Sequence, residues 1–298
     1  MQNFPAVIGQ GSFGTILRLR LELRNLKPRR LVTSYRKAFR LWRPAIPPGH
    51  HAFICNICGV HASAELARIL ERDAPSCPRC NSTLRFRAMM AALEEELLGT
   101  GKPLVRCRKR KDLDGVGLTD SGVYSHLLEE KFSYINTFFH ARPYLDLMAP
   151  PAGFQSRFDF IICADVMEHI PPPIQVAFAN LRTLLRPGGL LLFSVPYSRD
   201  DKTVEYFPDL HQFEILGDGA ERYLVNVTRA GESQVFKNLE FHGGTGATLE
   251  MRLFCEADIL RLLHESGFRQ IKIHSQSLPK WGIIYDSLFS LPITALAG

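Results

Sequence analysis

The part of the chain that most constrains its fold is a strand–helix–strand unit in the second half. Residues 158–163 (FDFIIC) and 190–195 (LLLFSV) are mostly apolar runs of strand length. Between them, Pro171–Pro173 precedes an amphipathic stretch at 174–185. Apolar strands joined by a crossover helix are typical of a parallel sheet that is buried on both faces. We therefore predict an α/β fold.

The remaining pattern places other segments around this unit. A length of 298 residues allows one large α/β domain and a small accessory module. Residues 84–98 have helical periodicity and end at glycines, and residues 256–266 and 270–274 predict a closing helix and strand. The predicted divisions are a basic arm and linker at 1–50, a zinc ribbon at 51–82, a linking helix at 83–101 and a larger domain at 102–298, with an insertion carrying its own hairpin at about 199–250.

Composition is that of a soluble globular protein, with 46% hydrophobic residues. Mostly apolar runs such as 190–195 are far shorter than the roughly 20 residues that cross a bilayer, so we expect no transmembrane segment. No signal peptide is predicted either. The seven cysteines comprise two close pairs and three scattered residues, which is an intracellular pattern. The expected location is the cytoplasm.

The paired cysteines predict a metal site. Cys55 and Cys58 form one Cys-x2-Cys pair, Cys77 and Cys80 form the other, and 18 residues separate the pairs. Two such knuckles can surround one tetrahedral Zn²⁺ with four thiolates. Four cysteines complete the coordination shell and leave no open position. The sequence therefore predicts a structural zinc ribbon and not a catalytic metal centre.

Positive charge is concentrated at the N-terminus. Residues 1–50 contain ten Lys or Arg and one acidic residue, whereas the net charge of the whole chain is +6. An arm of this kind suits phosphate, an acidic partner or the surface of an acidic membrane. RNA is therefore a candidate partner, with a basic tail that has no dedicated partner as the alternative.

The segment 158–198 resembles class I S-adenosylmethionine-dependent methyltransferases. That family commonly has a strand beginning Phe-Asp, then a Glu-His pair, and later a Leu-(Lys/Arg)-Pro-Gly-Gly turn; here these are Phe158-Asp159, Glu168-His169 and 185–189 (LRPGG). The stretch 254–275 is similar to the closing helix and strand of the family. The resemblance implies a Rossmann-like sheet and S-adenosylmethionine as cofactor.

The cofactor turn departs from the usual family pattern. In place of an acid followed by Gly-x-Gly-x-Gly, the chain has a strand at 115–118 and a turn at 119–122. No acid ends the second strand, where Asn136, Thr137 or His140 would have to compensate for it. The candidate cofactor-binding residues are Gly117, Thr119, Asp120, Ser121, Asp146 and Asp165. Asp120 and Ser121 are expected to contact the methionine end.

Histidines are the candidates for acid–base chemistry. His169 lies just past the 158–163 strand, and His211 and His242 lie in the insertion, with Glu250 as a candidate partner of one of them. A histidine base suits an oxygen acceptor, so we expect methylation of a sugar, glycan or other small-molecule hydroxyl. Two alternatives remain open: an RNA methyltransferase, or a non-catalytic methyltransferase fold that acts as a binding or scaffold protein.

Overall fold

The computed structural model describes residues 46–242 and 248–298. The predicted basic arm up to residue 45 and residues 243–247 of the predicted insertion lie outside these residues. Residues 48–298 form one compact unit. The predicted ribbon, helix and methyltransferase segments therefore belong to one body. Within the described ranges, no helix has the length and apolar character needed to cross a membrane.

A six-stranded sheet in the order β15-β16-β6-β5-β3-β4 forms the middle layer. Strands β4, β3, β5 and β6 are parallel, whereas β16 runs antiparallel to both β6 and β15. Their bounds are β3 Arg110–Leu118, β4 Phe132–Thr137, β5 Phe158–Ala164, β6 Leu185–Ser194, β15 Phe268–Ile273 and β16 Ile293–Ala297. The predicted Rossmann-like α/β sheet is thus confirmed, and β16, which was not predicted, adds an antiparallel strand to it.

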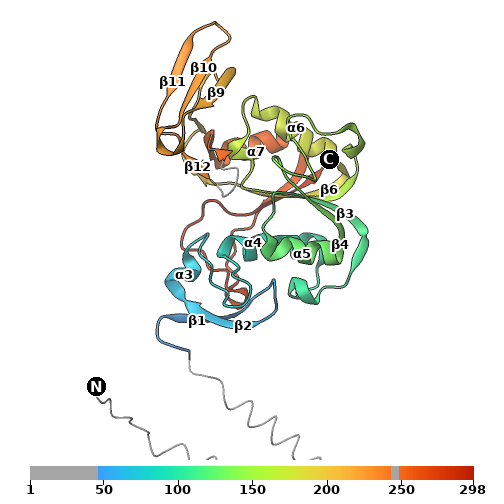
Figure 1. Ribbon diagram of the computed structural model, residues 1–298. Helices are drawn as coiled ribbons and strands as arrows, with labels where there is room; N and C mark the ends of the chain where they lie inside the picture. Colours follow the sequence, from blue (N-terminus) through green and yellow to red (C-terminus); the bar gives the residue numbers. More distant parts are fainter. Residues whose placement is uncertain (1–45, 243–247) are drawn as a thin grey trace, which may run out of the picture. The chain divides into compact units, whose positions relative to one another are not determined.

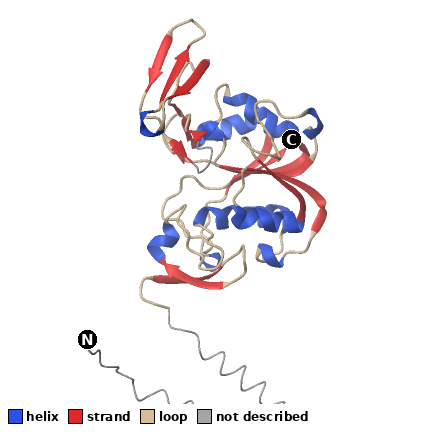
Figure 2. Cartoon of the chain, in the orientation of Figure 1, coloured by secondary structure: helices blue, strands red, loops and turns tan. Residues whose placement is uncertain are grey.

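Helices cover both faces of this sheet (Figure 2). They are α4 Leu84–Leu93 and α5 Gly122–Lys131 on one face, and α6 Ile174–Leu184 and α7 Glu256–Glu265 on the other. The short helix α3 Leu66–Leu70 lies beside the hairpin of the cysteine segment (Figure 1). Short polar side chains cap the N-termini of two of these helices. Thr83 accepts a hydrogen bond from Phe86 N at 3.2 Å at the start of α4, and Ser121 accepts one from Val123 N at 3.3 Å at the start of α5.

Strand β5 divides the apolar core into two layers. Ile161 and Cys163 face a cluster with α6 and α7, whereas Phe160 and Ile162 face a cluster with α4, α5 and the cysteine segment. All four side chains have no exposed surface. This burial on both faces accounts for the apolar FDFIIC sequence, because successive residues of a strand point to opposite faces.

The cysteine segment is built into one of these layers. It begins with an antiparallel hairpin of β1 His50–Ile54 and β2 His61–Glu65, and continues through α3 to the second cysteine pair. Ile57 and Ile69 are fully buried in the same cluster as Met89 of α4 and Leu128 of α5. Helix α4, predicted as a linker, is therefore part of the layer that covers the sheet (Figure 1).

The predicted insertion contains small sheets of its own. Strand β10 pairs with β9 and β11, β12 pairs with β13, and β14 pairs with β7 and β8. The bounds are β7 Tyr197–Ser198, β8 Val204–Glu205, β9 Gln212–Leu216, β10 Tyr223–Val227, β11 Ser233–Phe236, β12 Phe241–His242, β13 Thr248–Leu249 and β14 Arg252–Cys255. The sequence predicted one hairpin here. The structure contains more, namely the β9–β11 meander and the β12–β13 pair.

The chain between β15 and β16 returns to the cysteine segment. Ile283 is buried in a cluster with Leu84 and Ala88 of α4. Two nitrogens of the fully buried Arg87 guanidinium donate to the Gly282 carbonyl oxygen at 2.9 and 3.2 Å. This return, like β16, was not predicted, because it lacks the periodicity of a regular element.

Gly117 provides a stability test of the close packing at the end of β3. A Cβ atom at this position would overlap the Tyr134 hydroxyl and the Asp120 carboxylate. We expect Gly117→Ala to lower the free energy of unfolding by about 1–3 kcal/mol in urea denaturation. Gly122→Ala is the matched control, since a Cβ there meets no atom within 4 Å, and it should change stability little. Equal effects of the two substitutions would contradict this packing.

Candidate functional site

The candidate site lies at the carboxyl ends of the neighbouring strands β3 and β5. Here the chain connections that follow the two strands run to opposite sides of the sheet. Strand β3 pairs with β4 on one side and with β5 on the other, so the chain leaves β3 in one direction and returns on the other side. Open α/β sheets bind ligands at this kind of edge. The residues that directly follow the two strands, Thr119 and Asp165, have φ of +61° and +54°. Such conformations are uncommon outside glycine and cluster at functional sites.

A buried carboxylate holds the turn after β3. Asp120 is 6% exposed, and its two oxygens accept hydrogen bonds from the hydroxyls of Tyr124, at 2.8 Å, and Tyr134. The side-chain amide of Asn136 binds the backbone of Asp120 on both sides, accepting from its N–H at 2.9 Å and donating to its carbonyl at 2.8 Å. Burial raises the pKa of Asp120 to about 6. These contacts fix the turn from within.

Several residues that were predicted to bind the cofactor make hydrogen bonds to nearby groups of the protein. The Ser121 hydroxyl caps α5, and Asp146 Oδ1 accepts from Met148 N at 2.8 Å. The Thr137 hydroxyl donates to the Gly117 carbonyl at 2.7 Å, and Thr119 N donates to the Thr137 carbonyl at 2.7 Å. Gly117, Thr119, Asp120 and Ser121 therefore lie together at the sheet edge. Their contacts with a cofactor remain predictions.

Asp165 carries the main charged contacts of the site, and its partners were not found from the sequence. Arg72 Nη2 and Nη1 lie 2.8 and 3.0 Å from the two oxygens of Asp165, and Arg85 Nη1 lies 3.1 Å from Oδ2. Asp73 pairs with the same two arginines at 2.7 and 2.6 Å. The Ser194 hydroxyl donates to Asp165 Oδ1 at 3.1 Å. The cysteine segment and α4 thus contribute cations to this end of the six-stranded sheet.

The Glu-His pair lies beyond Asp165 in the sequence. Glu168 is 1% exposed and its Oε2 has no hydrogen-bond partner among the described residues. Burial and the neighbouring Asp165 carboxylate raise the pKa of Glu168 well above its usual range. His169 Nδ1 lies 3.0 Å from the Leu249 carbonyl oxygen. Because a carbonyl only accepts, Nδ1 carries a proton, and in the neutral ring Nε2 is left as the basic atom.

One of the two insertion histidines joins this group. The rings of His169 and His242 meet edge to face with centroids 5.8 Å apart, and His242 Nε2 lies 3.7 Å from Glu250 Oε2. The suggested pairing of Glu250 with a histidine is therefore present. His211 is exposed, and no hydrogen bond or ion pair within the described part of the chain joins its ring to His169. The three candidate histidines do not form one cluster.

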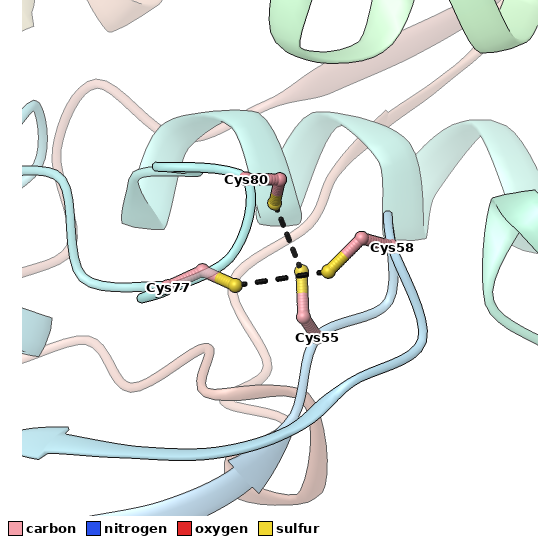
Figure 3. A group of neighbouring side chains, drawn as sticks. All are labelled: Cys55, Cys58, Cys77 and Cys80. Carbon is pink, nitrogen blue, oxygen red and sulfur yellow. Dashed lines mark hydrogen bonds between the residues drawn. The ribbon is translucent and has the colours of Figure 1, made fainter.

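The four paired cysteines converge as predicted (Figure 3). Their sulfur atoms all lie within 4.8 Å of one another, with 3.6 Å between those of Cys55 and Cys80 and 3.7 Å between those of Cys58 and Cys77. A tetrahedral ion with four metal–sulfur bonds of roughly 2.3 Å separates its ligands by about 3.8 Å. The buried guanidinium of Arg87 adds a positive charge near these sulfurs. The donor set and spacing fit a four-thiolate metal site.

Comparison with known proteins places most of the chain in one family. Residues 52–272 match the family model described as a methyltransferase domain. The ubiquinone biosynthesis O-methyltransferase of Acinetobacter baylyi is 27% identical over 111 residues, which are 37% of this chain and 42% of the relative. That of Histophilus somni is 38% identical over 48 residues, 16% of this chain and 20% of the relative. The chain spans less than half the length of these curated relatives.

Solved structures show a looser likeness. An S-adenosylmethionine-dependent methyltransferase from Mesorhizobium loti is 13% identical, with a TM-score of 0.41. The match covers 73% of this chain and 99% of that one.

The raised pKa of Asp120 predicts a pH-dependent stability. A folded-state pKa of about 6, above the ordinary 3.8, favours the protonated form in the folded chain. Its contribution is therefore fully present below about pH 4 and is lost as the pH rises through 6. Relative to Asp120→Asn, the wild-type free energy of unfolding should fall by up to about 3 kcal/mol across this range in urea denaturation. A constant difference between the two proteins would contradict the assignment.

Proposed function

Since the chain belongs to the methyltransferase domain family of class I S-adenosylmethionine-dependent enzymes, we propose that it transfers the methyl group of S-adenosylmethionine to a hydroxyl oxygen. The acceptor class we propose is a sugar, a glycan or another small molecule. The observation that carries this proposal is the environment of His169. This side chain lies just beyond the carboxyl end of β5, with Nδ1 committed to the Leu249 carbonyl.

The proposed cofactor site is the edge formed by the ends of β3 and β5. The turn at Thr119–Gly122 and the carboxylate of Asp165 would hold the cofactor there, and the fixed backbone around Gly117 permits close approach. When bound, S-adenosylmethionine supplies an electrophilic methyl group on its sulfonium and leaves as S-adenosylhomocysteine. The protein must then position the acceptor hydroxyl and remove its proton.

His169 is the proposed general base. Burial lowers the pKa of His169 below its ordinary value of 6.5, so the ring is neutral near pH 7. With Nδ1–H donated to Leu249, Nε2 is the atom that takes the hydroxyl proton. Nε2 lies 3.8 Å from Glu168 Oε1, so this carboxyl group faces the proton that the ring acquires. The His242–Glu250 pair, beside the ring of His169, is the proposed supporting pair. His211 has no place in this arrangement.

One observation supports an oxygen acceptor, and a second links the insertion to the proposed acceptor side. The similar curated proteins are O-methyltransferases by name, although the match covers less than half of each. The insertion strand β13 supplies the carbonyl that orients His169, so the β12–β13 pair borders the proposed acceptor side. RNA held by the basic arm remains the alternative acceptor, and the experiment below separates the two classes.

We also propose that Cys55, Cys58, Cys77 and Cys80 hold a structural Zn²⁺. The sulfur separations near 3.7 Å support this proposal, as does the closed four-thiolate donor set. Two of the cysteines, Cys55 and Cys77, are buried in the cluster that covers the sheet. The ion would therefore stabilise this covering layer as well as the hairpin itself.

Label transfer tests the reaction and its acceptor class. The purified chain is incubated with tritium-labelled S-adenosylmethionine and a deproteinised cell extract divided into small-molecule, polysaccharide and RNA fractions. We expect label in one of the first two, bound as a base-stable methyl ether. His169→Ala should lower the rate at least a hundredfold, whereas exposed His211→Ala should change it less than twofold. Label confined to RNA, or equal effects of the two substitutions, would contradict the proposal.

The pH dependence gives a second test of the base. Because His169 must be neutral to accept a proton, the wild-type rate should rise with pH through a midpoint below 6.5 and reach a plateau at higher pH. The rate is measured from pH 5 to 8 under saturating S-adenosylmethionine. A midpoint above 7 would exclude the buried, carbonyl-bound His169 as this base.

Metal analysis tests the cysteine site. We expect one equivalent of zinc per chain by atomic absorption, and a lower melting temperature after treatment with a strong chelator. Cys77→Ser should lower both the zinc content and the melting temperature. Cys107→Ser is the matched control, because Cys107 is a buried cysteine outside the group of four and should leave the zinc content unchanged. Protein that contains no zinc and is indifferent to the chelator would contradict the metal site.

A further inference from the structure

We propose that Arg72, Arg85 and Asp165 form a subsite for the zwitterionic α-amino-acid group of a ligand. Under the proposed function, on which this inference rests, that group is the methionine end of S-adenosylmethionine. Arg72 lies between the two cysteine pairs, and Arg85 lies in the first turn of α4. The cysteine segment would thus serve as one wall of the cofactor site and not only as a structural appendage.

The position of these three residues supports binding. Asp165 directly follows β5 in a left-handed conformation, next to the turn at Thr119 that ends β3. The side chains of Arg72, Arg85 and Asp165 remain 26%, 19% and 20% exposed, so the group is reachable from solvent. Arg72 Nε is buried and has no hydrogen-bond partner among the described residues. A buried donor without an acceptor is costly unless a bound group or water satisfies it.

The charges of this group match a zwitterion. Two guanidinium groups are paired with two carboxylates, Asp73 and Asp165, so the set is neutral. A bound α-carboxylate can take guanidinium donors, while Asp165 accepts from the bound ammonium. Each existing ion pair is then replaced by another of the same kind, and no charge is left buried alone. Guanidinium groups suit this role because they present several donors in a fixed plane.

The same geometry couples the cysteine site to the ligand. Arg72 is fixed between the cysteine pairs, and Arg85 follows the second pair by five residues. Arg85 N donates to the Arg72 carbonyl at 3.1 Å, which ties the two segments together beside Asp165. The precision of the guanidinium positions therefore depends on the fold of the cysteine segment.

Calorimetric titration with two ligands tests the subsite. S-adenosylhomocysteine carries the α-amino-acid group, whereas 5′-methylthioadenosine has the same nucleoside and thioether without it. We expect the wild type to bind S-adenosylhomocysteine more tightly. In Arg72→Ala and Arg85→Ala, its Kd should rise at least tenfold, while the Kd for 5′-methylthioadenosine should stay within about twofold. Arg85→Lys should recover part of the loss.

Controls separate this inference from the proposed function. Arg68→Ala removes an exposed arginine of the same segment that donates to the Pro75 carbonyl, and should leave both affinities unchanged. Zinc content and 5′-methylthioadenosine binding report whether each variant is folded. If the arginine variants weaken both ligands equally, or neither, the subsite is wrong while the proposed function stands. If the folded wild type binds neither ligand at millimolar concentration, both the proposed function and the subsite are overturned.

Discussion

Burial of β5 on both faces determines where the polar groups of this protein can lie. Interior positions of the strand are taken by Phe160, Ile161, Ile162 and Cys163, none of which has exposed surface. An unpaired charge in such a layer would be costly, so charged side chains gather where the strand ends. Asp165, Glu168 and His169 follow within five residues of Ala164. The chemistry of the site is thus concentrated at the carboxyl edge by the packing of the sheet.

The cysteine segment supplies part of the cover that this burial requires. Buried residues of the segment share a cluster with α4, α5 and the sheet, and the chain before β16 returns to the same region through Gly282. The family match also includes both parts, since it runs from residue 52, ahead of the cysteines, to residue 272. The segment and the sheet form one structure, and the arginines beside Asp165 are a consequence of that joint packing.

The elements that were predicted correctly are those whose own sequence has a distinctive local pattern. The strand–helix–strand unit of β5, α6 and β6 follows from its apolar runs and breakers, and the convergence of four cysteines follows from their spacing. Strand β16 was missed because a strand of five residues after a long irregular stretch has no distinctive period. Arg72 and Arg85 were missed for a different reason: a charged side chain in a loop or at a helix start does not reveal which distant carboxylate it meets.

The turn after β3 shows the same limit. Its position at Thr119–Gly122 was predicted, but the contacts that fix it come from Tyr124, Tyr134 and Asn136 on neighbouring elements. These residues give the turn rigidity without the usual glycines. His242 likewise reaches His169 only because the insertion folds back through β13. In both cases the site depends on tertiary contacts between segments far apart in the sequence.

A crystal structure of the zinc-loaded chain with S-adenosylhomocysteine would show whether the cofactor binds at the ends of β3 and β5. We expect the ligand to occupy the edge formed by the ends of β3 and β5, with its thioether on the side of His169 and its carboxylate against Arg72 and Arg85. Ligand bound elsewhere, or a site that stays empty at millimolar concentration, would contradict the claim that this edge is the cofactor site of a methyltransferase.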